Sequence, residues 1–255
     1  MQNNYFSKTN IINVLEKPNK NSNISSQIIY GEKIKILSKN KNFYKVKNLY
    51  DNYIGFVSRK IKLNKTFQAT HKIKTLNSQI YLGSENSKKQ PSNKHLPFGS
   101  KLEILKKKKN FIMFEKDKWI RSSHICLNSK KDKNFIKIFK LFSNCPYKWG
   151  GKTFEGIDCS ALIQIYYKFN NKFFPRDTID QIKQKKGSKI KKKYKKGDII
   201  FWKGHVAACI DSNNLIHAYG PKKKVVIMPI QNTIKRIQRT ANLKVKNKKN
   251  LLELI

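Results

Sequence analysis

Cys159 is the residue whose surroundings in the sequence point most directly to chemistry. A segment with three glycines between residues 150 and 156 precedes it, and Asp158 stands immediately before it. Apolar residues at positions 162, 165, 166 and 169 then follow the spacing of one face of an amphipathic helix. Asp158 is a favourable N-cap residue, so Cys159 is predicted in the first helical turn, where free N–H groups and the helix dipole favour a thiolate. We therefore interpret Cys159 as a nucleophile rather than as a buried structural cysteine.

A thiolate nucleophile needs a base, and the chain has five histidines. Three of them, His71, His95 and His124, lie in a β-rich region and have ordinary loop or surface interpretations. His205 and His217 fall on two apolar strands joined by a short turn. They share a face only if the connecting loop has an odd length or a bulge. Pairing Asp211 with Leu215 gives such a loop and predicts His217 opposite Cys209, on the face that carries His205.

Two loosely similar segments of short strands precede this region. Residues 1–64 alternate polar and apolar positions between turns, and residues 65–128 repeat the pattern with a basic turn at Lys106–Asn110. Aligning Gly31 with Gly99 gives a repeat of 68 residues. Strands at this spacing predict small β barrels, and both segments resemble bacterial SH3-like domains. Two unrelated β hairpins are the alternative.

The pattern changes at residue 129. Phe135–Phe142 has helical spacing, the helix that begins near Cys159 follows, and strands come after Gly197. A block of helices followed by strands indicates an α+β domain. The predicted fold class is therefore α+β, with two small SH3-like β barrels (1–64 and 65–128) followed by an α+β domain at 129–255.

Several motifs, taken in order, resemble the NlpC-type cysteine peptidases, which have a papain-like fold and act on bacterial cell-wall peptides. These motifs are Tyr147-x-Trp149-Gly150-Gly151, Asp158-Cys159-Ser160, Gly197-Asp198, Gly204-His205-Val206-Ala207 and Leu215-Ile216-His217-Ala218. They cover roughly residues 135–230. The SH3-like pair resembles the N-terminal part of family members that cleave γ-D-glutamyl–diamino acid bonds in murein peptides. Ala161 departs from the pattern, since many members have glycine there.

The resemblance assigns a role to each of seven residues. It implies that Cys159 is the nucleophile, His205 the base and His217 the polar third member that orients His205. Tyr147 would lie beside the oxyanion region. Asp158 and Ser160 would lie near the free amine of the substrate, and Tyr53 of the first SH3-like domain would close that amine pocket. The expected substrate is a small murein peptide with a free N-terminal L-Ala.

The composition limits the possible partners. The chain has 255 residues and a formal net charge of +41, but only five of its 56 cationic residues are arginines. Sites that bind nucleic acid favour arginine, so we interpret the lysine excess as compositional drift and do not expect nucleic acid as the partner. A polyanion partner stays the alternative. No apolar run reaches the roughly 18 residues of a membrane span.

The four cysteines are spaced without a C-x-x-C pair, so no metal and no cofactor are expected. We interpret Cys126, Cys145 and Cys209 as packing residues. The first eight residues contain no apolar signal-peptide core, which predicts a cytoplasmic protein.

Other functions stay open at this stage. The chain could be a non-catalytic protein that binds cell wall or a polyanion, an exported wall hydrolase, or an acyl- or lipid-transferring relative with the same Cys–His chemistry. A pure binding protein has no use for Cys159, His205 and His217 together, so the peptidase is the leading hypothesis. The sequence leaves the preferred diamino acid and the oligomeric state open.

Overall fold

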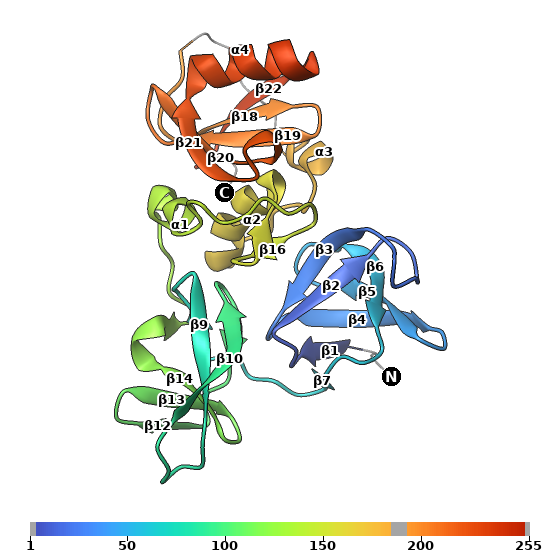
Figure 1. Cartoon of the computed structure of the whole chain (residues 1–255), viewed down its shortest axis with the longest axis vertical. Coiled ribbons are helices and arrows are strands. Elements are labelled where there is room, and N and C mark those ends of the chain that lie inside the picture. The colour runs from blue at the N-terminus through green and yellow to red at the C-terminus, as the bar shows by residue number, and fades with distance from the viewer. Residues whose placement is uncertain (1–3, 185–192, 253–255) are drawn as a thin grey trace. The chain divides into compact units, whose positions relative to one another are not determined.

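The computed structural model describes residues 4–184 and 193–252. The chain divides into two compact units, residues 1–131 and residues 132–255 (Figure 1). We describe each unit by itself. Within the first unit we call residues 4–64 the first lobe and residues 65–131 the second lobe.

The first lobe is a single antiparallel sheet in the order β3-β2-β6-β5-β4-β1-β7. The alternation of apolar and polar residues determines which face of the sheet is buried. In β4, Ile34 and Ile36 are buried while Lys33 and Lys35 are exposed. Apolar side chains from five strands form its core. The strands are β1 (Asn4–Ser7), β2 (Ile11–Leu15), β3 (Ile24–Ile29), β4 (Lys33–Lys39), β5 (Phe43–Asn48), β6 (Ile54–Ser58) and β7 (Leu63–Asn64).

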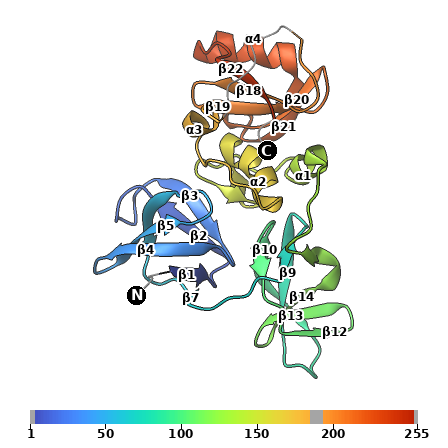
Figure 2. The same ribbon diagram turned by 180° about the vertical axis from the view of Figure 1, so that it is seen from behind.

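The second lobe has two small sheets, in the orders β10-β9-β14-β13-β12 and β11-β8-β15. The strands are β8 (His71–Ile73), β9 (Asn77–Leu82), β10 (Gln90–Pro97), β11 (Lys101–Leu102), β12 (Lys106–Lys108), β13 (Phe111–Glu115), β14 (Lys118–Arg121) and β15 (Ile125–Leu127), with a short 3-10 helix at Ser122–His124. Figure 2 shows β12, β13 and β14 side by side. The basic turn predicted at Lys106–Asn110 is wrong in extent, because Lys106–Lys108 pairs with β13 and only the next two residues turn.

The 68-residue repeat has a structural counterpart in its glycine turns. Gly31 and Gly99 both adopt a φ of +78°, which favours glycine, and each precedes a strand. The SH3-like fold of the second lobe and the boundaries at 64 and 128 stay predictions.

Tyr30 joins the two lobes. It follows the last residue of β3, yet its ring is buried in the core of the second lobe, where its centroid lies 5.5 Å from that of Phe114. Its hydroxyl donates to Glu115 Oε1 at 2.8 Å and accepts from Lys8 Nζ at 3.0 Å. Burial, reinforced by Glu115, raises the pKa of the Tyr30 phenol. One aromatic side chain therefore belongs to one lobe in sequence and to the other in packing.

The second unit has an α+β fold, as predicted. A five-stranded antiparallel sheet in the order β21-β20-β19-β18-β22 has α2 on one face and α4 on the other (Figure 1). Its helices are α1 (Phe135–Leu141), α2 (Cys159–Phe169), α3 (Thr178–Gln181) and α4 (Ile230–Ala241), with a 3-10 helix at Gly220–Lys222. Its strands are β16 (Lys152–Thr153), β17 (Gly156–Ile157), β18 (Asp198–Trp202), β19 (His205–Cys209), β20 (Asn214–Tyr219), β21 (Lys224–Pro229) and β22 (Asn247–Asn250).

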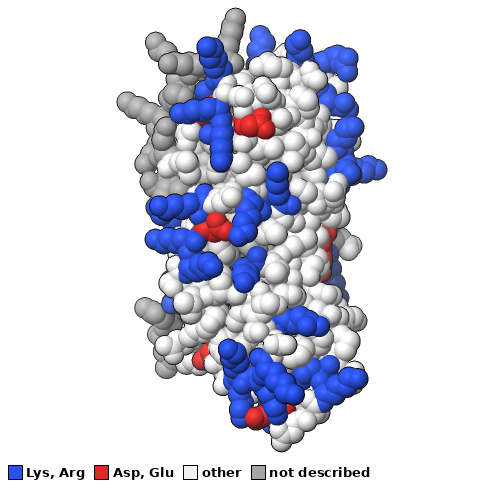
Figure 3. Space-filling view, turned by 90° about the vertical axis from the view of Figure 1, so that its left-hand side faces the viewer, with Lys and Arg blue, Asp and Glu red and all other residues white. Residues whose placement is uncertain are grey.

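The surface is rich in lysine. On the face drawn in Figure 3, Lys and Arg side chains occupy many separate places, with few Asp or Glu among them. Within the described ranges, no helix is both long and apolar enough to cross a membrane.

Candidate active site

The N-terminus of α2 carries the candidate nucleophile. Asp158 caps the helix, since its Oδ1 accepts a hydrogen bond from the Ala161 N–H at 2.8 Å. Cys159 is the first helical residue, and only 4% of it is exposed. The helix and the cap predicted from the apolar stripe are confirmed.

The Cys159 thiol lies beside the start of β19. Its Sγ is 4.0 Å from the carbonyl oxygen of Gly204, and the backbone N–H groups of Val206 and Ser160 hydrogen-bond the sulfur. Burial raises the pKa of Cys159 to about 12, and the charge of Asp158 acts in the same direction. The thiol therefore keeps its proton at neutral pH unless a nearby base removes it.

The two candidate histidines share one face of the β19–β20 hairpin, as the loop argument predicted. The exact register differs, because Cys209 pairs with Leu215. The same register places His217 opposite Ala207 rather than opposite Cys209. The shift arises at the turn, where Asp211 Oδ1 accepts from the N–H groups of residues 213 and 214 at 2.7 and 2.6 Å. The loop moves by one residue and keeps its odd length.

His205 and His217 are in direct contact. Nε2 of His205 lies 2.9 Å from Nδ1 of His217, which is fully buried and stacks on the Tyr219 ring with a centroid separation of 4.6 Å. Burial lowers the pKa of His205 to about 4. Burial also lowers the pKa of His217 well below its usual range, and the neighbouring His205 acts in the same direction. Both rings are therefore neutral at pH 7, and one of the two facing nitrogens donates a hydrogen bond to the other.

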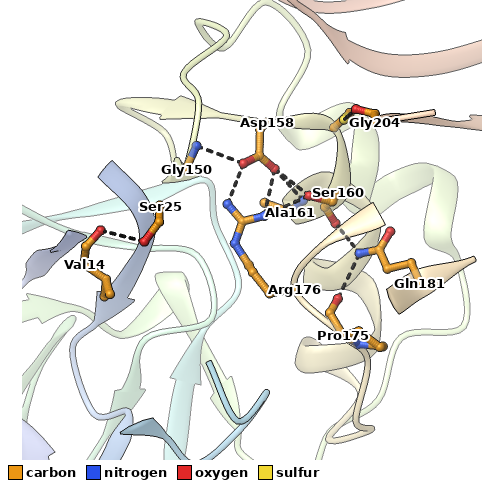
Figure 4. Close-up of polar contacts among 11 residues, drawn as sticks. Val14, Ser25, Gly150, Asp158, Ser160, Ala161, Pro175, Arg176, Gln181 and Gly204 are labelled. Atoms are coloured by element: carbon orange, nitrogen blue, oxygen red, sulfur yellow. Dashed lines mark hydrogen bonds and ion pairs between the residues drawn. The ribbon is translucent and has the colours of Figure 1, made fainter. Parts of the chain in front are cut away.

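Asp158 has a second function beside capping (Figure 4). Its Oδ2 accepts from the Gly150 N–H at 3.0 Å, which ties the glycine-rich loop to the helix. The Arg176 guanidinium binds both carboxylate oxygens, with Nη1 3.0 Å from Oδ1 and Nη2 2.5 Å from Oδ2. Asp158 and Arg176 are 5% and 3% exposed, so this is a buried, bidentate ion pair. The carboxylate next to the nucleophile is thus already neutralised within the protein.

Ser160 joins the same network. Its hydroxyl donates to Asp158 Oδ1 at 3.0 Å and accepts from Arg176 Nη1 at 2.8 Å. The Gln181 amide donates to the carbonyl oxygens of Ser160 and Pro175, both at 2.9 Å (Figure 4). These bonds hold residues 175–181, which follow α2, against the first turn of that helix. The roles of Asp158 and Ser160 toward a substrate amine stay predictions.

Arg176 and Gln181 were not among the residues predicted from the sequence. A signal for Arg176 was present, because it is one of only five arginines in a chain that uses lysine almost everywhere. A bidentate partner for a carboxylate requires arginine.

The two candidate tyrosines lie in different units. Tyr147 is half-buried, and burial together with the nearby Cys159 and Asp158 raises the pKa of its phenol. This places Tyr147 close to the nucleophile. Tyr53 lies in the first lobe, where it packs against the core and its N–H donates to Asp51 Oδ1 at 3.1 Å. Its role at the active site stays a prediction.

Two of the other cysteines, Cys145 and Cys209, have the surroundings of packing residues, whereas Cys126 is partly exposed and its packing role stays a prediction. All four cysteines are free thiols. Cys145 and Cys209 are buried, and burial raises the pKa of each thiol, that of Cys209 to about 12. In the part of the chain that the structure describes, no group of three His, Cys, Asp or Glu side chains is arranged to hold a metal.

Comparison with known families decides the class of this site. The sequence from residue 144 to residue 242 matches the NlpC/P60 family. Residues 144–242 form an NlpC/P60 domain. This domain belongs to a class of cysteine peptidases that includes peptidoglycan hydrolases. Residues 10–61 match the bacterial SH3 domain, which identifies most of the first lobe.

Relatives of this chain include named peptidases. It is 24% identical over 234 residues to a γ-D-glutamyl-L-lysine dipeptidyl-peptidase of Bacillus subtilis, covering 83% of this chain and 77% of the relative. A Bacillus cereus protein of the same name is 34% identical over 106 residues, covering 38% of this chain and 31% of the relative. A solved structure of an NlpC/P60 family protein from Bacillus cereus superposes with a TM-score of 0.81 at 19% identity, covering 98% of this chain and 99% of the other. At that identity the likeness shows the fold alone.

Proposed function

We propose that this chain is a cysteine peptidase that hydrolyses the γ-D-glutamyl–diamino acid bond of murein peptides. The observation that carries the proposal is the placement of Cys159 at a helix N-terminus beside the strand of His205, whose ring lies 2.9 Å from that of His217. The NlpC/P60 match supports the reaction class, and the names of the Bacillus relatives support the bond.

The first half of the reaction forms an acyl-enzyme. Nδ1 of His205 removes the proton from Cys159 Sγ as the sulfur attacks the γ-carbonyl carbon of the D-glutamyl residue. Backbone N–H groups at the first turn of α2 stabilise the oxyanion that develops. His205, now an imidazolium, returns the proton to the amine of the diamino acid as the C–N bond breaks. A thioester on Cys159 remains.

The second half releases the glutamyl product. Nδ1 of His205 removes a proton from water, and the hydroxide attacks the thioester carbonyl carbon. The C–S bond breaks and the proton returns to Cys159. In both halves His217 holds the His205 ring through the 2.9 Å contact at Nε2, and we assign the other ring nitrogen, Nδ1, to proton transfer with the sulfur.

The proposed substrate is a short peptide with a free N-terminal L-Ala. We assign Tyr147 to the oxyanion side of the pocket, Asp158 and Ser160 to the amine side, and Tyr53 to the wall that closes the amine pocket. Because Arg176 already pairs with Asp158, we expect amine selectivity to depend on Tyr53 more than on the carboxylate alone. Such selectivity suits an enzyme that meets peptide fragments in the cytoplasm.

The test is product analysis by mass spectrometry. The protein is incubated with L-Ala-γ-D-Glu-L-lysine and with the diaminopimelate analogue, and L-Ala-D-Glu plus the free diamino acid are the expected products. An α-linked L-Ala-L-Glu-L-lysine peptide of the same composition is the matched control and should stay intact. Cleavage of the L-Ala–D-Glu bond, or no cleavage of either γ-linked peptide, would reject the proposed bond specificity.

A further inference from the structure

Met228 supplies a sulfur atom on the far side of the His217 ring. Its Sδ lies 3.4 Å from Nε2 of His217, while Nδ1 of the same ring lies 2.9 Å from Nε2 of His205. A thioether can accept a hydrogen bond but has no proton to donate. The hydrogen bond between the two side chains must therefore be donated by His217 Nε2–H.

The sheet register accounts for this contact. In the β20–β21 ladder His217 pairs with Val226 and Leu215 pairs with Met228, so Met228 and His217 occupy diagonal positions on one face. Met228 packs against the apolar cluster that α4 covers. His217 is fully buried, and its ring lies at 11° to that of Tyr219. The imidazole plane is thus held by packing, and its nitrogens are matched to two fixed neighbours.

We propose that Met228 is a positioning residue that fixes the tautomer of His217 and, through it, the tautomer of the base. A neutral imidazole carries one ring proton. With that proton on Nε2 of His217, Nδ1 is an acceptor and His205 must donate to it from Nε2. Nδ1 of His205 is then left without a proton, in the state that can take one from Cys159. This inference rests on the proposed function, which makes His205 the base.

The opposite tautomer blocks catalysis. If Nδ1 of His217 carries the proton, it faces Nε2 of His205, which must then act as the acceptor. His205 would carry its own proton on Nδ1 and could not remove one from the thiol. Loss of the Met228 acceptor therefore creates a fraction of enzyme with the wrong proton arrangement. The catalytic side chains Cys159, His205 and His217 are all still present in such a variant.

Two variants and one control test the assignment. Met228→Leu removes the acceptor and keeps an apolar side chain, and Met228→Gln supplies an amide oxygen in its place. Ile227→Leu is the control, because Ile227 is 43% exposed and lies on the other face of the same strand. For Met228→Leu we expect kcat to fall by about fivefold with KM unchanged, the size of one ordinary hydrogen bond, and for Met228→Gln we expect partial recovery.

Nitrogen-15 NMR of the histidine rings gives a readout that does not depend on turnover. Wild-type His217 should show an unprotonated Nδ1, and Met228→Leu should shift population toward the protonated form. A protonated Nδ1 in the wild type overturns the proposal. An unchanged tautomer in Met228→Leu also overturns it, even where kcat falls, because the effect would then be one of packing. If no γ-glutamyl peptide is cleaved, the proposed function fails while the spectra still decide the tautomer.

Discussion

The Arg176 guanidinium binds both carboxylate oxygens of Asp158, the residue that directly precedes the candidate nucleophile. The same carboxylate caps α2 and binds the N–H of the glycine-rich loop. One buried ion pair therefore fixes three things together: the first turn of the helix, the loop before it and the segment after it. Its integrity should matter for stability as well as for activity.

We expect Arg176→Ala to lower the free energy of unfolding by about 3–5 kcal/mol, because it leaves the Asp158 carboxylate buried without a cation. Arg176→Lys restores the charge but not the second hydrogen bond and should recover only part of the loss. Urea denaturation measures the free energy of unfolding of both variants. Arg59→Ala removes an exposed arginine and is the matched control, with an expected change within about 0.5 kcal/mol. Equal effects of the Arg59 and Arg176 variants would show that the pair is not structural.

Cys159→Ala should abolish peptide hydrolysis while the protein keeps its fold, because it removes the nucleophile and only a small side-chain volume. Cys209→Ala serves as the comparison, since that thiol is equally buried but has a packing environment. It should keep activity and lose about 1 kcal/mol of stability. Turnover and thermal unfolding of both variants check this. Normal turnover by Cys159→Ala would end the thiol mechanism.

The pH dependence follows from the buried imidazole. Burial lowers the pKa of His205 from 6.5 to about 4 and raises that of Cys159 to about 12. The neutral base then persists well into the acid range, so kcat/KM should stay level through neutral pH and fall only as His205 gains a proton near pH 4. A pH–rate profile measures this. A midpoint near 6.5 would show that water reaches the ring.

The same pKa shift affects folding. Between pH 6.5 and about 4 the unfolded chain binds a proton at position 205 that the folded chain does not bind. The contribution of His205 to stability is therefore complete above pH 6.5 and is lost as the pH falls toward 4. His205→Gln should show a smaller loss of stability over that interval than the wild type. Denaturation curves at several pH values test the difference.

Blocking the N-terminus of the substrate should reduce kcat/KM by tenfold to a hundredfold, the size of one charge-assisted contact of about 1.5–3 kcal/mol. The comparison is between the free tripeptide, its N-acetyl form and intact murein. If the Tyr53 hydroxyl recognises the amine, Tyr53→Phe should reduce the difference in kcat/KM between the free tripeptide and its N-acetyl form. Equal rates on all three substrates would remove the selectivity and favour an exported wall hydrolase.

Hydrolysis should continue after treatment with a chelator, because a thiol–imidazole pair provides both the nucleophile and the proton transfer. The assay uses the same tripeptide before and after EDTA and dialysis. Activity that disappears and returns when zinc is added would contradict a cofactor-free reaction.

The sequence was sufficient where a short-range rule governs the structure. A helical stripe and an N-cap placed Cys159 in the first turn of α2, and loop parity placed His205 and His217 on one face. The loop was off by one residue and each cross-strand partner by two, because an aspartate side chain in the turn binds two N–H groups, a contact that residue spacing does not reveal. Because the loop keeps its odd length, His205 and His217 still share one face. The residues paired across the two strands nevertheless differ from those predicted.

Long-range partners escaped prediction. Arg176 lies 18 residues after Asp158 and reaches it only because the segment beyond α2 folds back over the first turn of the helix. Met228 meets His217 through the β20–β21 register, which hydrophobic pattern alone leaves undetermined. Both contacts depend on tertiary arrangement. The scarcity of arginine marks Arg176 in the sequence but does not identify its partner, and no local pattern marks Met228.

Tyr30 has a consequence for how the first unit can change over evolutionary time. A domain that is exchanged between genes as a free-standing module must carry its own core. Separating the two lobes would expose the Tyr30 ring, empty a place beside Phe114 and leave Glu115 without the phenol it binds. We therefore expect the two lobes to be retained together rather than exchanged singly, even though each has the outline of a separate unit in sequence.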